Sequence, residues 1–262
     1  METVLQRGMR ERGFIGPIRM FSLSDAAKLR GAFYRTAGID ESRPGKQPRP
    51  LSQMHWEHSW VWDMATHPDL LDIAEEILGP DLIMWSTNFW YKPHEGQKPV
   101  PWHQEGSIYT GIAPRINLTA WVALTDSTVQ NGCMRVIPSQ DRSLIEHEVL
   151  VPGTTRRLDH ALPDQYVDES RAIDIEMSPG EVLFFDEGLV HSSYVNQCPN
   201  TARIGFSIRL TTPEVRFKMD QWDSVGETVR LFAVRGTDRL NLNAGLYGDV
   251  TAPHLTPAGA TA

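Results

Sequence analysis

The chain has few cysteines and no long apolar run. Only 2 of its 262 residues are cysteines, Cys133 and Cys198, which is too few for a disulfide framework. Neither belongs to a Cys-x-x-Cys pair, so a thiolate zinc site is not expected. No stretch has the apolar length that a membrane-spanning helix needs, and charges run through the first 14 residues, unlike a secretory signal. We therefore expect a cytoplasmic protein.

Basic residues are also in the minority. The chain has 25 Lys and Arg against 33 Asp and Glu, which gives a formal net charge of −8. Binding to nucleic acid or to an anionic membrane relies on basic surfaces, so we predict neither partner and expect a small-molecule substrate. The oligomeric state cannot be predicted from these observations. With 40% hydrophobic and 22% charged residues, the chain has the composition of one ordinary globular domain spanning residues 1–262.

Helices are expected near the start of the chain and strands after them. Residues 24–38 open with Ser-Asp and stop at Gly38, and residues 66–80 have Thr66 as a cap and end with Gly-Pro, so both predict amphipathic helices. From residue 82 onward, short segments rich in β-branched and aromatic residues alternate with turn residues. This order predicts a β-sandwich or jelly roll with helices packed outside.

Three His-x-acid triplets stand out as candidate metal ligands, where random placement gives roughly one. The triplet at His67 lies at a helix start, where side chains two residues apart diverge, so a solvated cap is expected there. The triplet at His55 lies in an aromatic-rich loop. In a strand, by contrast, His103 and Glu105 would share one face and could hold one cation.

A third ligand is needed, and His191 in "FFDEGLVHSSYV" is the best candidate. Taken alone, His191 would more often be a hydrogen-bonded strand histidine. Together, however, two histidines and one carboxylate leave open positions on iron for a bidentate 2-oxo acid and dioxygen. This is the ligand set of non-haem Fe(II) oxygenases.

Residues 79–212 resemble the phytanoyl-CoA dioxygenase-like branch of the Fe(II)/2-oxoglutarate oxygenases. The segments that carry the resemblance are "GPDLIMWSTNFWYKP", "PWHQEG", "TAWVALTDSTVQNGCMRVIPSQ", "PGEVLFFDEGLVHSS" and "ARIGFSIRLTT". The resemblance implies a mainly β protein, a double-stranded β-helix (a cupin-like jelly roll) with flanking N-terminal helices. Residues 1–80 would be mostly helical flank and loop, 81–212 the jelly-roll core and 213–262 a C-terminal extension.

The resemblance also implies roles for single residues. His103 and His191 match the iron histidines, and Glu105 stands where the family usually has Asp. Glutamate is longer by one methylene, so the iron would shift or the side chain fold back. Halogenating relatives have a small residue at this position, where chloride binds, so Glu105 argues against halogenation.

The cosubstrate site is predicted in the same way. Arg203 matches the arginine that binds the far carboxylate of 2-oxoglutarate, and Ser193 and Trp121 match residues that line the pocket. Strand alternation in "ARIGFSIRL" puts Arg203 on one face with Ser207 and Arg209, as if that face lined a polar pocket. A surface salt bridge is the alternative for Arg203, and plain core packing is the alternative for Trp121.

Further residues are candidates for contact with ligands. Asn88 could hydrogen-bond the cosubstrate or be a structural strand amide. His55, Trp90 and Tyr109 are candidate substrate contacts, with His55 in a loop before a helix that could close over the pocket. A second metal site at His55 and His58 has no distant third ligand and is disfavoured.

The expected function is oxidation of a small metabolite or natural product. Fe(II) and 2-oxoglutarate would combine with O2 to hydroxylate, or otherwise oxidise, an unactivated C–H bond, with release of succinate and CO2. One alternative is a non-catalytic cupin-like module that binds a small molecule. A metal-dependent hydrolase or isomerase on the same barrel is another, but it would have no need of Arg203.

Overall fold

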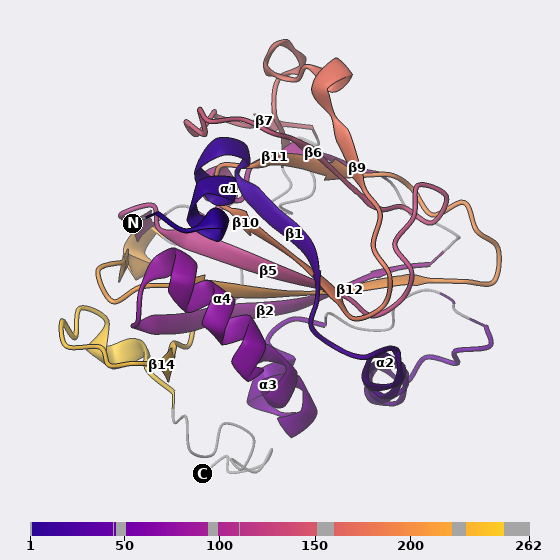
Figure 1. Cartoon of the computed structure of the whole chain (residues 1–262), viewed down its shortest axis with the longest axis horizontal. Coiled ribbons are helices and arrows are strands. Elements are labelled where there is room, and N and C mark those ends of the chain that lie inside the picture. Colours follow the sequence, from indigo (N-terminus) through magenta and orange to yellow (C-terminus); the bar gives the residue numbers. More distant parts are fainter. Residues whose placement is uncertain are drawn as a thin grey trace.

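The structure is a computed structural model that describes residues 2–43, 45, 51–93, 99–109, 111–150, 160–221 and 229–248. Two antiparallel sheets dominate it (Figure 1). The larger sheet has the strand order β1-β10-β5-β12-β2-β14, with bounds β1 Phe14–Arg19, β10 Glu181–Asp186, β5 Asn117–Ala123, β12 Arg203–Thr211, β2 Leu82–Lys92 and β14 Phe232–Arg235. The smaller sheet has the order β3-β11-β6-β9, with bounds β3 Val100–His103, β11 Val190–Ser193, β6 Met134–Ile137 and β9 Ile173–Ile175.

Short elements complete the chain. Two small sheets pair β13 Arg216–Phe217 with β4 Ile112–Ala113, and β7 Glu148–Val149 with β8 His160–Ala161. The α-helices are α1 Val4–Arg12, α2 Leu23–Ala37, α3 Ser59–Ala65, α4 Pro68–Leu78 and α5 Glu105–Ile108. The 3-10 turns are η1 Met54–Trp56, η3 Asp164–Tyr166, η4 Glu169–Arg171, η5 Met219–Gln221 and η6 Ala244–Leu246. The predicted jelly roll with flanking helices is confirmed, although the larger sheet also includes β1 and β14, outside residues 81–212.

The larger sheet has an apolar core on each face. Between the two sheets, Trp121 and Phe185 of the larger sheet pack with Val136 and Ile175 of the smaller one. On the other face, side chains of β5 and β12 pack under the N-terminal helices, which Figure 1 shows lying across this sheet. Strand alternation produces the division, because Ile204, Phe206, Ile208 and Leu210 all belong to the helix-side core. The expected two-faced β12 is therefore confirmed.

The helices follow the expected signals with small differences at their starts. Ser22 caps α2 by accepting a hydrogen bond from the Asp25 backbone N–H, and Gly38 ends it in a left-handed conformation. The α4 helix begins with Pro68 at its first position, and the cap residue is His67 rather than Thr66. The Thr66 hydroxyl instead donates to the Trp62 carbonyl in the preceding helix. None of the helices described is long and apolar enough to cross a membrane.

Candidate metal centre and cosubstrate pocket

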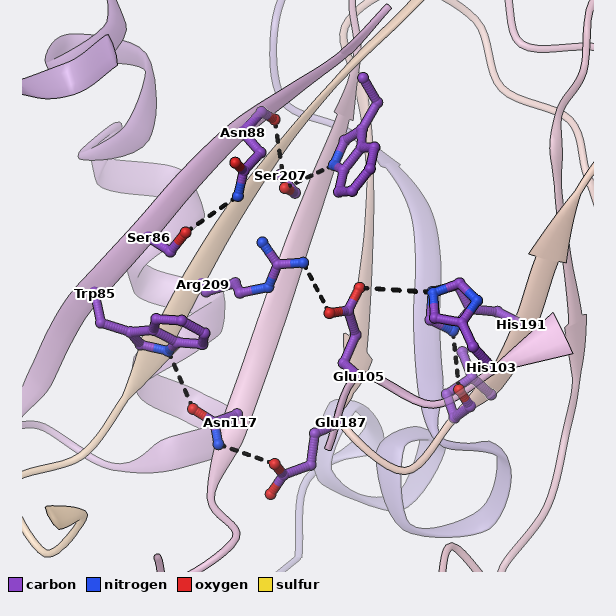
Figure 2. Close-up of polar contacts among 12 residues, drawn as sticks. Trp85, Ser86, Asn88, His103, Glu105, Asn117, Glu187, His191, Ser207 and Arg209 are labelled. Carbon is purple, nitrogen blue, oxygen red and sulfur yellow. Dashed lines mark hydrogen bonds and ion pairs between the residues drawn. The ribbon is translucent and has the colours of Figure 1, made fainter. Parts of the chain in front are cut away.

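Two histidines far apart in the sequence meet in the smaller sheet. His103 ends β3 and His191 lies in β11, where the two residues are register partners with ring centroids 4.0 Å apart. Glu105 completes the group, with its Oε1 atom 3.9 Å from His103 Nε2 and 3.8 Å from His191 Nε2 (Figure 2). All three side chains are buried, and their candidate ligand atoms lie within 4.8 Å of one another. This spacing fits a single bound cation.

Backbone hydrogen bonds orient both imidazoles. His103 Nδ1 lies 2.8 Å from the Pro101 carbonyl oxygen, and His191 Nδ1 lies 2.9 Å from that of Leu189. A carbonyl only accepts, so each Nδ1 carries the proton and each Nε2 presents a lone pair toward Glu105. Burial lowers the pKa of His103 to about 3 and also lowers that of His191. Both rings are therefore neutral at physiological pH, the form that binds a metal.

Glu105 reaches the site from a helix start and not from a strand. The expectation that His103 and Glu105 lie in one strand is wrong, because β3 ends at His103 and α5 begins at Glu105. Gln104 between them is extended, so its side chain points away from the site. There its amide nitrogen donates to the Gly188 and Ser143 carbonyls at 2.7 and 3.1 Å, and its oxygen accepts from the Ile145 N–H at 2.9 Å. These bonds fix the turn that presents Glu105.

The two oxygens of Glu105 have different surroundings. Oε2 accepts a hydrogen bond from an Arg209 NH2 group at 2.8 Å, while Oε1 faces the two histidines. Burial by itself would raise the pKa of Glu105, but the charge and hydrogen bond of Arg209 outweigh it and bring the pKa to about 2. The carboxylate is thus ionised, with one oxygen held by Arg209 and the other directed at the metal position.

A pocket next to this group contains most of the predicted cosubstrate residues. Its lining consists of Trp90, Val100, His103, Glu105, Thr119, Trp121, Met134, Phe185, His191, Ser192, Ser193, Arg203 and Ser207. Trp121 lines this pocket and also belongs to the core between the sheets. Trp90 donates from its indole N–H to the Ser207 hydroxyl at 2.9 Å.

Arg203 is a buried cation in the wall of this pocket. Only 4% of the residue is exposed, and its guanidinium lies 5.2 Å from the centre of the Trp121 ring. Burial lowers its pKa to about 10, which still leaves it charged at neutral pH. Within the described residues Arg203 forms no ion pair with an acid, and its Nε has no hydrogen-bond partner. A buried charge without a counter-ion is costly, so the site favours an anionic ligand.

Gly205 is a residue that the sequence reasoning missed. A Cβ atom at this position would lie 1.9 Å from the Trp121 side chain, so only glycine lets the indole lie across β12. The available signal was a glycine in the middle of the strand "ARIGFSIRL", since such a glycine often marks close approach of another group.

Three predicted residues do not line the pocket. His55 is fully buried on the helix side of the larger sheet, where it contacts Thr87 at 2.8 Å and packs against Phe232, and burial lowers its pKa to about 3. Asn88 donates its side-chain amide to Ser86, and Tyr109 lies with its ring 4.8 Å from the Arg209 guanidinium. Tyr109 is therefore linked to the metal group through Arg209, whereas His55 is separated from it by the sheet.

Glu187 is a second acid near the centre that the sequence did not single out. Its Oε2 accepts from the Asn117 amide at 3.0 Å, and that amide in turn accepts from the Trp85 indole N–H at 3.1 Å (Figure 2). Burial raises the pKa of Glu187 to about 7. A carboxyl with this pKa exchanges its proton near neutral pH, where Glu105 is ionised.

Comparison with known proteins is consistent with this geometry. The family model of phytanoyl-CoA dioxygenase (PhyH) matches residues 9–204. The chain belongs to the phytanoyl-CoA dioxygenase family. The peroxisomal phytanoyl-CoA dioxygenase of Homo sapiens is 25% identical over 167 residues, which cover 62% of this chain and 49% of that protein. The chain spans about half the length of the curated relatives it matches.

Solved structures show the same fold. The apo form of the non-heme monooxygenase ThoJ is 27% identical, covers 89% of this chain and 84% of its own, and superposes with a TM-score of 0.70. CytC3 with Fe(II) and alpha-ketoglutarate is 19% identical, with a TM-score of 0.64 and coverage of 90% of this chain and 89% of its own. At that identity CytC3 supports the fold alone.

Proposed function

We propose that this member of the family is an Fe(II)- and 2-oxoglutarate-dependent dioxygenase that oxidises a C–H bond of a small molecule. The observation that carries the proposal is a single pocket that combines the His103, Glu105 and His191 group with the uncompensated charge of Arg203. The first feature suits a metal and the second an anion. A 2-oxo acid with a second carboxylate would bind to both, with its 2-oxo acid end at the metal and its second carboxylate at Arg203.

The donor set fits Fe(II). Two neutral imidazole nitrogens and one carboxylate oxygen form a facial triad that leaves three positions for other ligands. When bound, iron activates dioxygen, and the overall reaction converts 2-oxoglutarate, O2 and a C–H bond into succinate, CO2 and a C–OH group. The protein's residues hold the reactants together and exclude water from them.

Arg203 would bind the far carboxylate of 2-oxoglutarate. A guanidinium matches a carboxylate in shape and charge, and its position over Trp121 fixes one side of the pocket. Ser193 would add a hydroxyl contact and Trp121 the wall. A contact between Asn88 and the cosubstrate remains a prediction. In the structure, the Asn88 side-chain amide donates to the Ser86 hydroxyl.

The substrate would be a small metabolite or natural product that approaches the metal past Trp90, which lines the pocket. A substrate contact at Tyr109 is not proposed, because this ring is buried against Arg209 outside the pocket. Hydroxylation is the expected outcome, and the Arg209 hydrogen bond to Glu105 reinforces the argument against halogenation, because this carboxylate is held in the position that a halide would need. A substrate contact at His55 is not proposed, because His55 lies on the other face of the sheet.

An anaerobic titration tests this function. The full chain with Fe(II) should bind 2-oxoglutarate with the visible charge-transfer absorption of a chelated 2-oxo acid. Exposure to O2 and a library of small metabolites should then release succinate in a substrate-dependent way. Oxidation that continues undiminished without 2-oxoglutarate would overturn the proposal, and binding without turnover of any compound would favour the non-catalytic cupin-like module.

A further inference from the structure

Lys92 is a second buried cation near the cosubstrate pocket. It ends β2 opposite Arg203, its register partner on β12, and only 4% of it is exposed. Its ammonium donates to the Ser193 hydroxyl at 2.8 Å and to the Tyr194 backbone carbonyl. No ion pair joins Lys92 to an acid in the portions of the chain that the structure describes. Two neighbouring cations thus share a region without a compensating carboxylate.

The surrounding chain is shaped to admit this side chain. Gly132 has a φ of +92°, and a Cβ there would lie 2.8 Å from Lys92 Cδ and 2.7 Å from the Tyr194 oxygen. The Asn196 amide donates to the Lys92 carbonyl at 3.0 Å, which fixes the end of β2 against the segment after β11. The lysine stem therefore packs directly against the turn that contains Gly132, and a side chain at that position would collide with it.

The Lys92 contact determines the direction of the Ser193 hydroxyl. A hydroxyl has one hydrogen to donate, and an ammonium has no lone pair to accept it. Ser193 must therefore accept from Lys92 and donate elsewhere. Because Ser193 lines the same pocket as Arg203, the natural acceptor is an anion in that pocket.

We propose that Lys92 is a positioning residue for the far carboxylate of the cosubstrate, acting through Ser193 and adding its charge to that of Arg203. The inference rests on the proposed function, because it takes 2-oxoglutarate as the ligand of this pocket. The new element is the cause of the preference for a dicarboxylate, which we assign to Lys92 and Arg203 on neighbouring strands together with the Ser193 hydroxyl.

The electrostatics of the region agree with this role. Burial lowers the pKa of Lys92 to about 7, and the charge of Arg203 acts in the same direction. The other groups that face the ammonium are the neutral Ser193 hydroxyl and Tyr194 carbonyl, together with Cys133, whose pKa burial raises to about 12. A bound carboxylate would favour the charged ammonium, so cosubstrate binding should take up a proton near pH 7 to 8.

The test compares two ligands that differ only at the far end. 2-Oxoglutarate and 2-oxopentanoate share the 2-oxo acid that chelates the metal, but 2-oxopentanoate has a methyl group in place of the far carboxylate. Calorimetric titrations with the full chain bound to Ni(II) measure both affinities without turnover. Lys92→Met should weaken 2-oxoglutarate binding by about tenfold or more, since contacts with charged groups contribute that much, and leave 2-oxopentanoate within about twofold.

Other variants separate the possible causes. Lys28→Met, on the exposed surface of α2, is the matched control and should change neither affinity. Ser193→Ala should weaken 2-oxoglutarate binding, and Lys92→Met should add less in that background than it does alone. The proton uptake measured in buffers of different ionisation enthalpy should vanish in Lys92→Met. If Lys92→Met does not fold, Lys92→Gln keeps a donor for Ser193 without the charge and should still lose affinity for 2-oxoglutarate selectively.

Two results would overturn the inference: unchanged 2-oxoglutarate affinity in the Lys92 variants, or an equal loss for both ligands, which indicates a purely structural lysine. Failure of the proposed function gives a different pattern. In that case the unmodified protein would not prefer 2-oxoglutarate over 2-oxopentanoate, and Arg203→Met would change neither affinity. A normal preference that depends on Arg203 but not on Lys92 rejects this inference alone.

Discussion

Arg209 holds the metal-facing carboxylate of Glu105 through a buried hydrogen bond of 2.8 Å. Removing one partner of a buried ion pair costs about 3–5 kcal/mol, because it leaves the other charge without compensation. Arg209→Met should therefore lower the free energy of unfolding of the metal-free protein by about 3 kcal/mol in urea denaturation. Ni(II) should restore more stability to this variant than to the unmodified protein, because the ion replaces the lost positive charge.

The control for this comparison is an arginine at the surface. Arg19 pairs with Glu181 at 3.2 Å with 44% of its side chain exposed, so Arg19→Met should cost less than about 1 kcal/mol. An equal loss of stability in the two variants would contradict the importance assigned to Arg209.

Glu105 itself should be indispensable for iron. Glu105→Ala removes a charge and a coordination bond, so iron binding should weaken by more than about tenfold, given that even groups which only orient a ligand contribute that much. Glu105→Asp should do less harm, because it restores the carboxylate that is usual in the family. Iron content and succinate formation are the measurements. Glu57→Ala and Asp69→Ala change exposed acids of the other two triplets, so both variants should keep their iron and their succinate formation. If Glu57→Ala loses iron and activity while Glu105→Ala keeps them, the metal is bound at the His55 segment instead.

Arg203→Ala should separate cosubstrate binding from metal binding. The far carboxylate would lose its main partner, at a cost of roughly 2–5 kcal/mol in 2-oxoglutarate affinity, while iron binding survives. The apparent affinity for 2-oxoglutarate and the iron content of the same sample decide the matter. An unchanged affinity would show that another cation holds the carboxylate.

Gly205→Ala tests whether the position of Trp121 depends on the missing side chain. The added methyl group would displace the indole, because a Cβ atom at this position would lie only 1.9 Å from the Trp121 ring. Overpacking of this kind costs about 1–3 kcal/mol, and the displaced ring should also weaken 2-oxoglutarate binding. Both losses should shrink in the Gly205→Ala/Trp121→Leu double variant. Wild-type affinity and stability in Gly205→Ala would show that the ring can move at no cost.

Glu187 should make stability depend on pH. Its pKa in the folded protein, about 7, lies above the usual 4.5. Between pH 4.5 and about 7, the folded state therefore keeps a proton that the unfolded state has released. Its contribution to stability is thus present below pH 4.5 and is lost as the pH rises to about 7, by an amount on the order of 1–3 kcal/mol. Glu187→Gln should remove this loss, which makes the variant relatively more stable at pH 8 than at pH 5 in urea denaturation. A constant difference between the two proteins over this range would contradict the shifted pKa.

Much of the fold and of the site could be predicted from local patterns. Strand alternation already assigned Arg203, Ser207 and Arg209 to one face of β12 and the apolar residues to the other, since neighbouring side chains in a strand must point in opposite directions. Local context favoured the His103 triplet over the other two and pointed to His191 as the third ligand, and the motif resemblance matched these residues to the iron ligands. The structure has this division of β12 and brings the three side chains together, because both depend on residue order within single strands or on quoted motifs.

Tertiary structure decided the rest. The pairing of β3 with β11 brings His103 against His191, and a turn held by Gln104 directs Glu105 to them from a helix start. The sequence could not predict that Arg209 would bind this carboxylate, that Lys92 would lie beside Arg203, or that His55 would be enclosed in the helix-side core. Each of these contacts joins residues that are distant in the chain, so it depends on which strands are neighbours and in what register. That register is set by the packing of the whole barrel and its helices, and no local pattern contains it.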